Sequence, residues 1–163
     1  MMKRILLVVL VAGVLSACSK KYECSYNGCD YPAVQTEIDA LQNHITSNSI
    51  NAEKDCSGVF YTILEQGTGD WFDACSDVTV SYKGMRMSDN FIFDQTVDPG
   101  TGQEFYRRFN LGGLIAGWRS ALPKIKRGGK IRLYIPPSLG YGNQAQQNIP
   151  ANSYLIFEVK VAP

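Results

Sequence analysis

The sequence is poor in several features on which common protein functions depend. It has one histidine, His44, among 163 residues, and a formal net charge of +1. A single histidine leaves Ser/His and Cys/His catalysis with one candidate side chain, and we expect that side chain to be solvated on a helix. The balanced charge gives no electrostatic case for binding nucleic acid or an acidic substrate. The glycines of "LGGLIAG" are not followed by the Lys-Ser/Thr ending of a phosphate-binding loop.

Long apolar runs are also missing. The longest, "ILLVVLVAGVL" at residues 5–15, is well below the ~20 residues that a membrane-spanning helix needs. With "MMKR" before it and "LSAC" after it, the run predicts a signal peptide over residues 1–17. Its end resembles the lipobox of bacterial lipoproteins, which implies cleavage before Cys18 and a lipid anchor on that residue. We therefore expect the protein to be located in the cell envelope. Ser19, directly after the anchored cysteine, favours the periplasmic side of the outer membrane. An ordinary signal peptide with an incidental cysteine is the alternative.

Four further cysteines, Cys24, Cys29, Cys56 and Cys75, would enter an oxidising compartment after export. Four cysteines allow three pairings. We expect Cys24–Cys29 and Cys56–Cys75, because the second bridge would join the starts of two strands. A zinc site is the alternative, but the sequence has no C-x-x-C spacing and no histidine close to these cysteines.

The rest of the chain divides into an extension and one larger domain. Residues 18–57 form a lipidated polar tether and a short amphipathic helix, which the apolar spacing predicts over residues 32–47. From residue 58 the pattern changes to the alternation typical of strands. Strands are expected at residues 59–67, 77–87, 91–94, 104–111, 130–137 and 153–162, with one short helix at 114–122. Residues 58–163 are therefore predicted to form an α+β domain, an antiparallel sheet that curls over one short helix.

Several segments of this domain together resemble the FKBP-type peptidyl-prolyl cis–trans isomerases. They are "VSYKG", "FIFDQT", "FNLGGLIAGWRSAL", "GGKIRLYIPPSLGYG" and "NIPANSYLIFEVKV", in this order. The resemblance implies the FKBP-like fold, a five- to six-stranded antiparallel sheet curled around one short helix. It also implies isomerisation of X–Pro bonds without a cofactor or a metal. The same resemblance implies an apolar pocket that binds proline-containing polypeptides as partners. Ligands of the macrolide class would bind in the same pocket.

The pocket residues of the family have matching positions in this chain. It implies catalytic roles for Tyr82, Phe93, Asp94, Ile115, Trp118 and Tyr141, and substrate contacts for Leu114, Ile149 and Phe157. Asp94 directly follows three apolar residues. We expect it to be buried in the cleft and to accept a hydrogen bond from the Tyr82 hydroxyl or a nearby arginine, because an unpaired buried carboxylate is costly.

The chain also departs from the family pattern. Arg107 stands where many members have an aromatic residue, so it thins one wall of the cleft or places a cation near the substrate. The loop "NQAQQ" is polar and contains no aromatic residue. Two functions of different classes therefore stay open. One is a lipid-anchored, monomeric prolyl isomerase that assists the folding of exported proteins. The other is a non-catalytic chaperone or binding module for proline-containing client segments.

Overall fold

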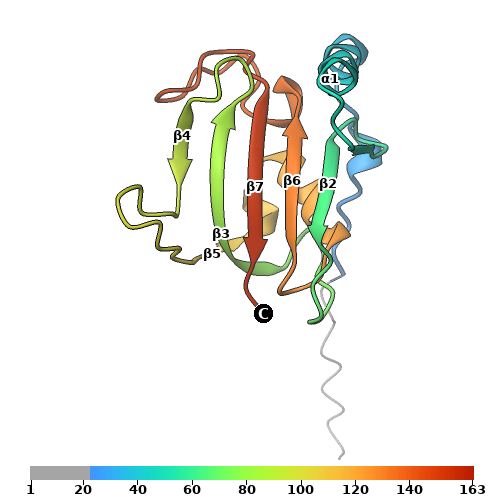
Figure 1. Cartoon of the computed structure of the whole chain (residues 1–163). Coiled ribbons are helices and arrows are strands. Elements are labelled where there is room, and N and C mark those ends of the chain that lie inside the picture. The colour runs from blue at the N-terminus through green and yellow to red at the C-terminus, as the bar shows by residue number, and fades with distance from the viewer. Residues whose placement is uncertain (1–22) are drawn as a thin grey trace, which may run out of the picture.

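The computed structural model describes residues 23–163, which form one antiparallel sheet with a short helix against one of its faces (Figure 1). The strands are β1 (Glu53–Lys54), β2 (Phe60–Glu65), β3 (Asp77–Arg86), β4 (Ile92–Gln95), β5 (Arg107–Asn110), β6 (Lys130–Ile135) and β7 (Leu155–Val161). The helices are α1 (Gln35–Ser47) and α2 (Ala116–Ala121), with short 3-10 turns η1 (Gly28–Asp30), η2 (Leu111–Gly113), η3 (Leu122–Lys124) and η4 (Pro137–Leu139).

The strand order of the sheet is β1-β2-β6-β7-β3-β4, and β5 also pairs with β3. β3 pairs with β7 along one edge, while β5 and β4 follow each other along its other edge. Figure 1 shows β4 and β5 at the left of the sheet, with α2 behind it. This arrangement leaves β4 with a single neighbouring strand, which determines how the site opens to solvent.

All six strands predicted within residues 58–163 are present, and a seventh strand, β1, precedes this domain and extends the sheet to seven strands. β1 lies after the predicted helix, where the sequence predicts no strand, and it pairs with β2 through Lys54 and Phe60. Both residues of β1 are exposed. An exposed two-residue strand carries no apolar alternation, so its pairing leaves no signal in the sequence.

The predicted amphipathic helix begins three residues later than expected. Val34 is its N-cap residue and is 55% exposed, so it does not belong to the buried face of the helix. Ile38, Leu41 and Ile45 are buried as the spacing predicts.

The short helix α2 packs closely on the sheet because it carries a glycine at the contact. A Cβ atom on Gly117 would lie 2.6 Å from Cγ2 of Ile135 in β6, far closer than carbon atoms approach. The buried residues Trp118 and Ala121 face the same core. α2 thus holds an aromatic ring against the inner face of the sheet, where the site forms.

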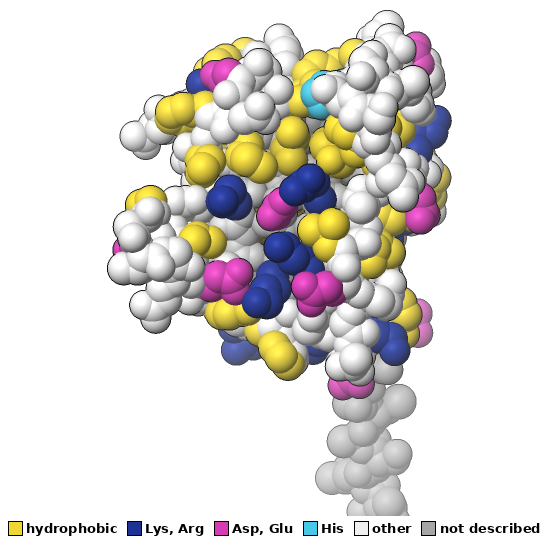
Figure 2. All heavy atoms as spheres, viewed as in Figure 1, with side chains coloured by type: hydrophobic (Ala, Val, Ile, Leu, Met, Phe, Trp, Pro, Cys, Tyr) yellow, Lys and Arg dark blue, Asp and Glu magenta, His cyan; other side chains and the backbone are white. Residues whose placement is uncertain are grey.

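The opposite face of the sheet is charged at its centre and carries apolar side chains around the charges, among them the buried Tyr134 and Ile156 (Figure 2). Figure 2 shows charged side chains gathered over its centre. Glu158 pairs with Arg132 and with Lys130, and Lys160 pairs with Glu104 at 3.0 Å. Only the charged part of this face lies in water, whereas a fully solvated second face is common in antiparallel sheets. Within residues 23–163, no helix has the length and apolar character to cross a membrane.

The predicted disulfide pairing is wrong. The bridges are Cys24–Cys75 and Cys29–Cys56, with Cα atoms 5.6 and 5.0 Å apart. Both bridges join the segment before α1 to residues that follow α1, Cys75 within the domain and Cys56 just before it. The predicted Cys24–Cys29 bridge would instead have closed a small loop within the segment before α1.

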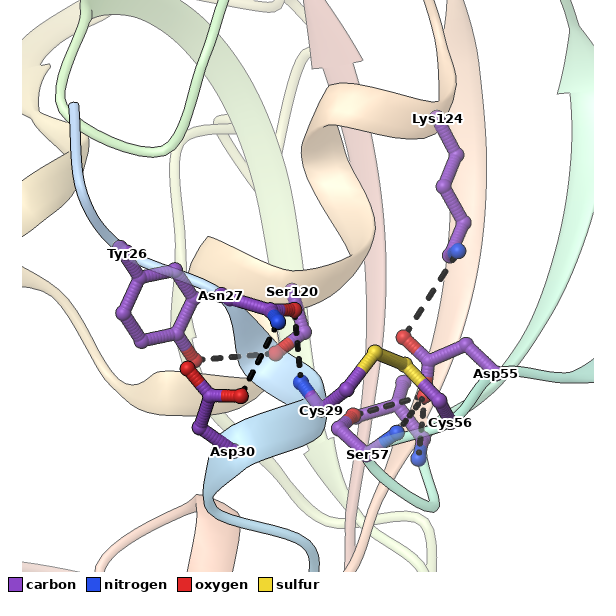
Figure 3. Close-up of a disulfide and its surroundings, with 10 residues drawn as sticks. Tyr26, Asn27, Cys29, Asp30, Asp55, Cys56, Ser57, Ser120 and Lys124 are labelled. Carbon is purple, nitrogen blue, oxygen red and sulfur yellow. Dashed lines mark hydrogen bonds and ion pairs between the residues drawn. A yellow bond between two sulfur atoms is a disulfide. The ribbon is translucent and has the colours of Figure 1, made fainter. Parts of the chain in front are cut away.

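The bridges fix residues 24–31 against the back of α2, so this part of the predicted tether lies on the domain (Figure 3). The Tyr26 hydroxyl lies 3.0 Å from Ser120 Oγ, and the Arg119 guanidinium lies 3.8 Å from the centre of the Tyr26 ring. Asp55 accepts hydrogen bonds from the backbone N–H and the hydroxyl of Ser57 beside the Cys29–Cys56 bridge (Figure 3). The segment therefore supports α2 from the side opposite the sheet. Residues 1–17 and Cys18 lie outside the described residues.

Candidate functional site

A cavity of about 220 Å³ lies between α2 and the inner face of the sheet. Its lining comes from β3, β4, β5, β7, α2 and two loops: Tyr82, Phe93, Asp94, Phe109, Leu114, Ile115, Trp118, Tyr141 and Phe157. Eight of these nine residues are ones that the family resemblance implies. Residues that are more than seventy positions apart in the sequence, from Tyr82 to Phe157, thus line one cavity.

The floor of the cavity is a cluster of aromatic rings. The Trp118 ring meets Tyr82 and Phe157 edge to face, with ring centres 5.4 and 5.2 Å apart. Phe93 meets Phe157 in the same way at 5.6 Å. Edge-to-face pairs add about 0.5–1.5 kcal/mol each beyond the area that they bury. The rings therefore fix one another and present a rigid apolar surface.

This ring cluster requires the absence of a side chain at residue 84. Gly84 lies in β3 between Phe157 of β7 and Asp94 of β4 in the strand register. A Cβ atom there would lie 2.7 Å from Phe157 Cε1 and 2.8 Å from Phe93 Cε2. Glycine lets both rings pack over the strand.

Asp94 accepts a hydrogen bond from the Tyr82 hydroxyl at 2.5 Å, which confirms the predicted partner. The expectation that Asp94 is buried is wrong, because its side chain is exposed at the rim of the cavity. The physical reason is the position of β4 as the last strand of the sheet, covered by a neighbour on one side only. The three apolar residues before Asp94 suggested burial, but Phe91 and Ile92 are themselves exposed.

The two tyrosines of the cavity are held in their neutral form. Burial raises the pKa of Tyr82 most, and the hydrogen bond to Asp94 raises it further, while the charge of Arg107 acts in the opposite direction. Burial and the charge of Asp94 also raise the pKa of Tyr141. Both phenols keep their protons at neutral pH; Tyr82 donates its proton to Asp94, and the Tyr141 hydroxyl can donate to a ligand.

The predicted set of cavity residues is wrong at two positions. Ile149 is only 4% exposed but is not part of the lining, and it forms a bridge with Gln146 in the loop before β7. Phe109 belongs to the lining and was missed. The sequence contains a signal for it, since Phe109 alternates with exposed neighbours in the strand predicted at residues 104–111.

His44 lies on α1 and does not line this cavity. Within the described part of the chain, one group of side chains has the spacing of metal ligands: Cys24, Asp73 and Cys75. Its two sulfur atoms are bonded to each other, so neither is a thiolate ligand. The arrangement of the cavity instead favours binding of a small apolar group beside a few hydrogen-bonding atoms.

An antiparallel sheet packed on a short helix, with an aromatic cavity between them, defines an FKBP-like binding domain. Residues 73–162 match the family model described as "FKBP-type peptidyl-prolyl cis-trans isomerase". The match spans more than half of the chain, and the chain belongs to this family.

Named relatives agree with this assignment. The chain is 42% identical over 106 residues to the "Probable FKBP-type peptidyl-prolyl cis-trans isomerase" of Haemophilus influenzae, covering 64% of this chain and 42% of the relative. It is 39% identical over 105 residues to FkpA of Escherichia coli K12, covering 64% of this chain and 37% of the relative. The match thus spans about two fifths of the length of these curated relatives.

Solved structures show the same fold. A peptidyl-prolyl cis-trans isomerase from Pseudomonas syringae pv. tomato superimposes with a TM-score of 0.64 at 29% identity, covering 80% of this chain and 95% of the other. The crystal structure of FkpA from Escherichia coli gives a TM-score of 0.61 at 32% identity, covering 79% and 63%.

Proposed function

We propose that this protein catalyses cis–trans isomerisation of X–Pro bonds in polypeptide segments. The observation that carries the proposal is the convergence of eight family pocket residues on one apolar cavity. The reaction moves no proton and needs no metal or cofactor, because only one amide bond rotates. The uncatalysed rotation has a barrier of ~18–20 kcal/mol and takes tens to hundreds of seconds.

The cavity suits this reaction through its low polarity. A planar amide is more polar than a twisted one, so transfer from water to an aromatic cavity disfavours the planar ground state relative to the twisted state. Each ~1.36 kcal/mol of this difference accelerates rotation tenfold. Trp118, Phe157 and Phe93 form the apolar floor on which the prolyl ring would lie.

Polar atoms at the rim would orient the substrate. The Tyr141 hydroxyl and the Ile115 backbone N–H are the proposed donors to substrate carbonyls, each contributing about 1 kcal/mol. Asp94, held by the Tyr82 hydroxyl, presents a carboxylate beside the rotating bond. It would act through its charge rather than as a base.

The proposed setting is the cell envelope, where the protein would assist the folding of exported polypeptides as a lipid-anchored monomer. Two disulfides support a location outside the reducing cytosol. The apolar run at residues 5–15 and the "LSAC" segment support export and lipidation of Cys18. Macrolides that mimic a prolyl segment are proposed ligands of the same cavity.

The activity is tested by exchange NMR on an X–Pro peptide, which reads both isomers without a coupling protease. We expect the intact chain to accelerate exchange, Asp94→Ala to lower kcat/KM by roughly tenfold, and Tyr141→Phe by roughly fivefold, which is the loss of one hydrogen bond. Peptide binding without acceleration would instead support the non-catalytic module. For the anchor, labelled fatty acid should enter the wild-type chain in cells and not Cys18→Ser.

A further inference from the structure

The cation Arg107 lies on strand β5, two residues before Phe109, which lines the cavity. Arg107 pairs with Val80 of β3, and Phe109 pairs with Val78. Directly paired residues of antiparallel strands project from the same face of the sheet. Val78, Val80 and Tyr82 alternate along β3 on the inner face, so Arg107 projects toward the cavity side, as Phe109 does.

The side chain of Arg107 is exposed and has a defined neighbour. Its guanidinium carbon lies 5.5 Å from the centre of the Phe105 ring, within the range of a cation–π contact. The Phe105 side chain is itself 43% exposed. The positive charge of Arg107 also acts on a residue of the cavity, because it lowers the pKa of Tyr82 and so opposes the rise caused by burial. Arg107 therefore stands at the entrance with its polar end toward water.

The acidic groups around Arg107 are mostly engaged elsewhere. Asp77 pairs with Arg108 at 2.8 Å, Glu104 pairs with Lys160 at 3.0 Å, and Asp98 accepts hydrogen bonds from the backbone of its own turn. Asp94 accepts a hydrogen bond from the neutral Tyr82 hydroxyl, so it keeps its negative charge but forms no ion pair with Arg107. Among residues 23–163, Arg107 makes no ion pair with a carboxylate. Its charge is free to meet a carboxylate that arrives with a ligand.

We propose that Arg107 is a specificity-determining residue, which makes the cleft prefer polypeptide segments with an acidic side chain next to the proline. The inference rests on the proposed isomerase function. An exposed ion pair strengthens binding by a factor of roughly two to five. A ligand with the same charge as Arg107 should bind more weakly by a similar factor. We therefore expect kcat/KM to be roughly three- to tenfold higher for a Glu-containing peptide than for its Lys counterpart.

The neighbouring arginine offers a matched control. Arg108 is one residue away on β5, but it pairs with Thr79 and projects from the opposite face of the sheet, where it binds Asp77. Arg108→Ala removes the same charge from the same strand without changing the cavity mouth. It should leave the Glu-to-Lys ratio at the wild-type value.

The experiment measures kcat/KM by exchange NMR for peptides with Glu, Ala or Lys placed in turn on each side of the proline. Arg107→Ala should bring the Glu-to-Lys ratio near one, Arg107→Lys should keep it above one, and Arg107→Glu should invert it. About 1 M salt, where the screening length is about 3 Å, should also abolish the wild-type preference. A purely structural role for Arg107 would change all peptides equally.

The outcomes separate the two proposals. No acceleration of any peptide by the wild-type chain would overturn the proposed function. Acceleration with equal rates for Glu and Lys peptides on both sides of the proline would overturn the role of Arg107 alone, as would a wild-type preference that persists in Arg107→Ala. The wild-type ratio and its salt dependence need no variant, so a variant that folds poorly does not spoil the test.

Discussion

The floor of the cavity depends on a missing side chain, which makes Gly84→Ala a sharp test of the described packing. The added methyl group would lie 2.7 Å from Phe157 and 2.8 Å from Phe93. Carbon atoms in contact prefer separations of about 3.5–4.0 Å. At least one ring must therefore move by several tenths of an ångström or more.

Neither ring can move freely. Phe157 is 3% exposed and is packed against Trp118 and Phe93. Overpacking a core in this way costs about 1–3 kcal/mol. In a chain of this size, each kcal/mol lowers Tm by about 2–4 °C, so we expect a fall of roughly 2–12 °C. Because the displaced rings form the cavity floor, we also expect kcat/KM to fall by at least about tenfold.

Thermal unfolding by circular dichroism and exchange NMR on one X–Pro peptide measure the two effects. Gly100→Ala is the control, because its Cβ atom would meet only Asp98 Oδ1 at 3.5 Å, an ordinary contact. It should match the wild type in both assays. If the Gly84→Ala variant had the same Tm and kcat/KM as the wild type, the proposed packing of the two rings over β3 would be refuted.

Two further predictions concern the bridges and the buried phenol. Replacing Cys29 and Cys56 together by serine should lower the free energy of unfolding by about 2–4 kcal/mol in urea denaturation, because the bridge closes a loop with a sequence separation of 27; unchanged stability would contradict a role in fixing residues 24–31. The raised pKa of Tyr82 makes no contribution to pH dependence below pH ~10, where this phenol is neutral in the folded and unfolded states alike. Above pH ~10 the unfolded chain releases the proton first, so stability should fall with rising pH, and Tyr82→Phe should lessen that fall in denaturation curves. Equal slopes for both proteins would speak against a buried neutral donor.

The strands show how much of the fold the sequence could predict. β3, β6 and β7 alternate apolar and polar residues because one face of the sheet lies on the core and the other in water, and this alternation is visible in the chain. β1 has no buried residue and β4 lies at the edge of the sheet. For such elements the deciding interactions are backbone pairings with distant segments, which leave little trace in side-chain pattern. The exposure of Asp94 was missed for this reason.

The cysteines show the same limit. The predicted Cys24–Cys29 bridge spans five positions, whereas the observed Cys24–Cys75 bridge spans 51. Each doubling of a loop adds only about 0.6 kcal/mol to the entropy cost of closing it, so the longer bridge costs roughly 2 kcal/mol more. That difference is small beside the packing that brings residues 24 and 75 together. Sequence distance therefore says little about which cysteines meet.

By itself, the sequence determined the alternating strands, the short helix with its tryptophan, and the family to which the pocket residues belong. These properties depend on local spacing and on motifs that can be read along the chain. Only the tertiary structure decided the cysteine pairing, the place of Phe109 in the cavity and of Ile149 outside it, and the free cation at the mouth. Those depend on which distant segments become neighbours, and the whole packed core sets that rather than any single stretch of residues.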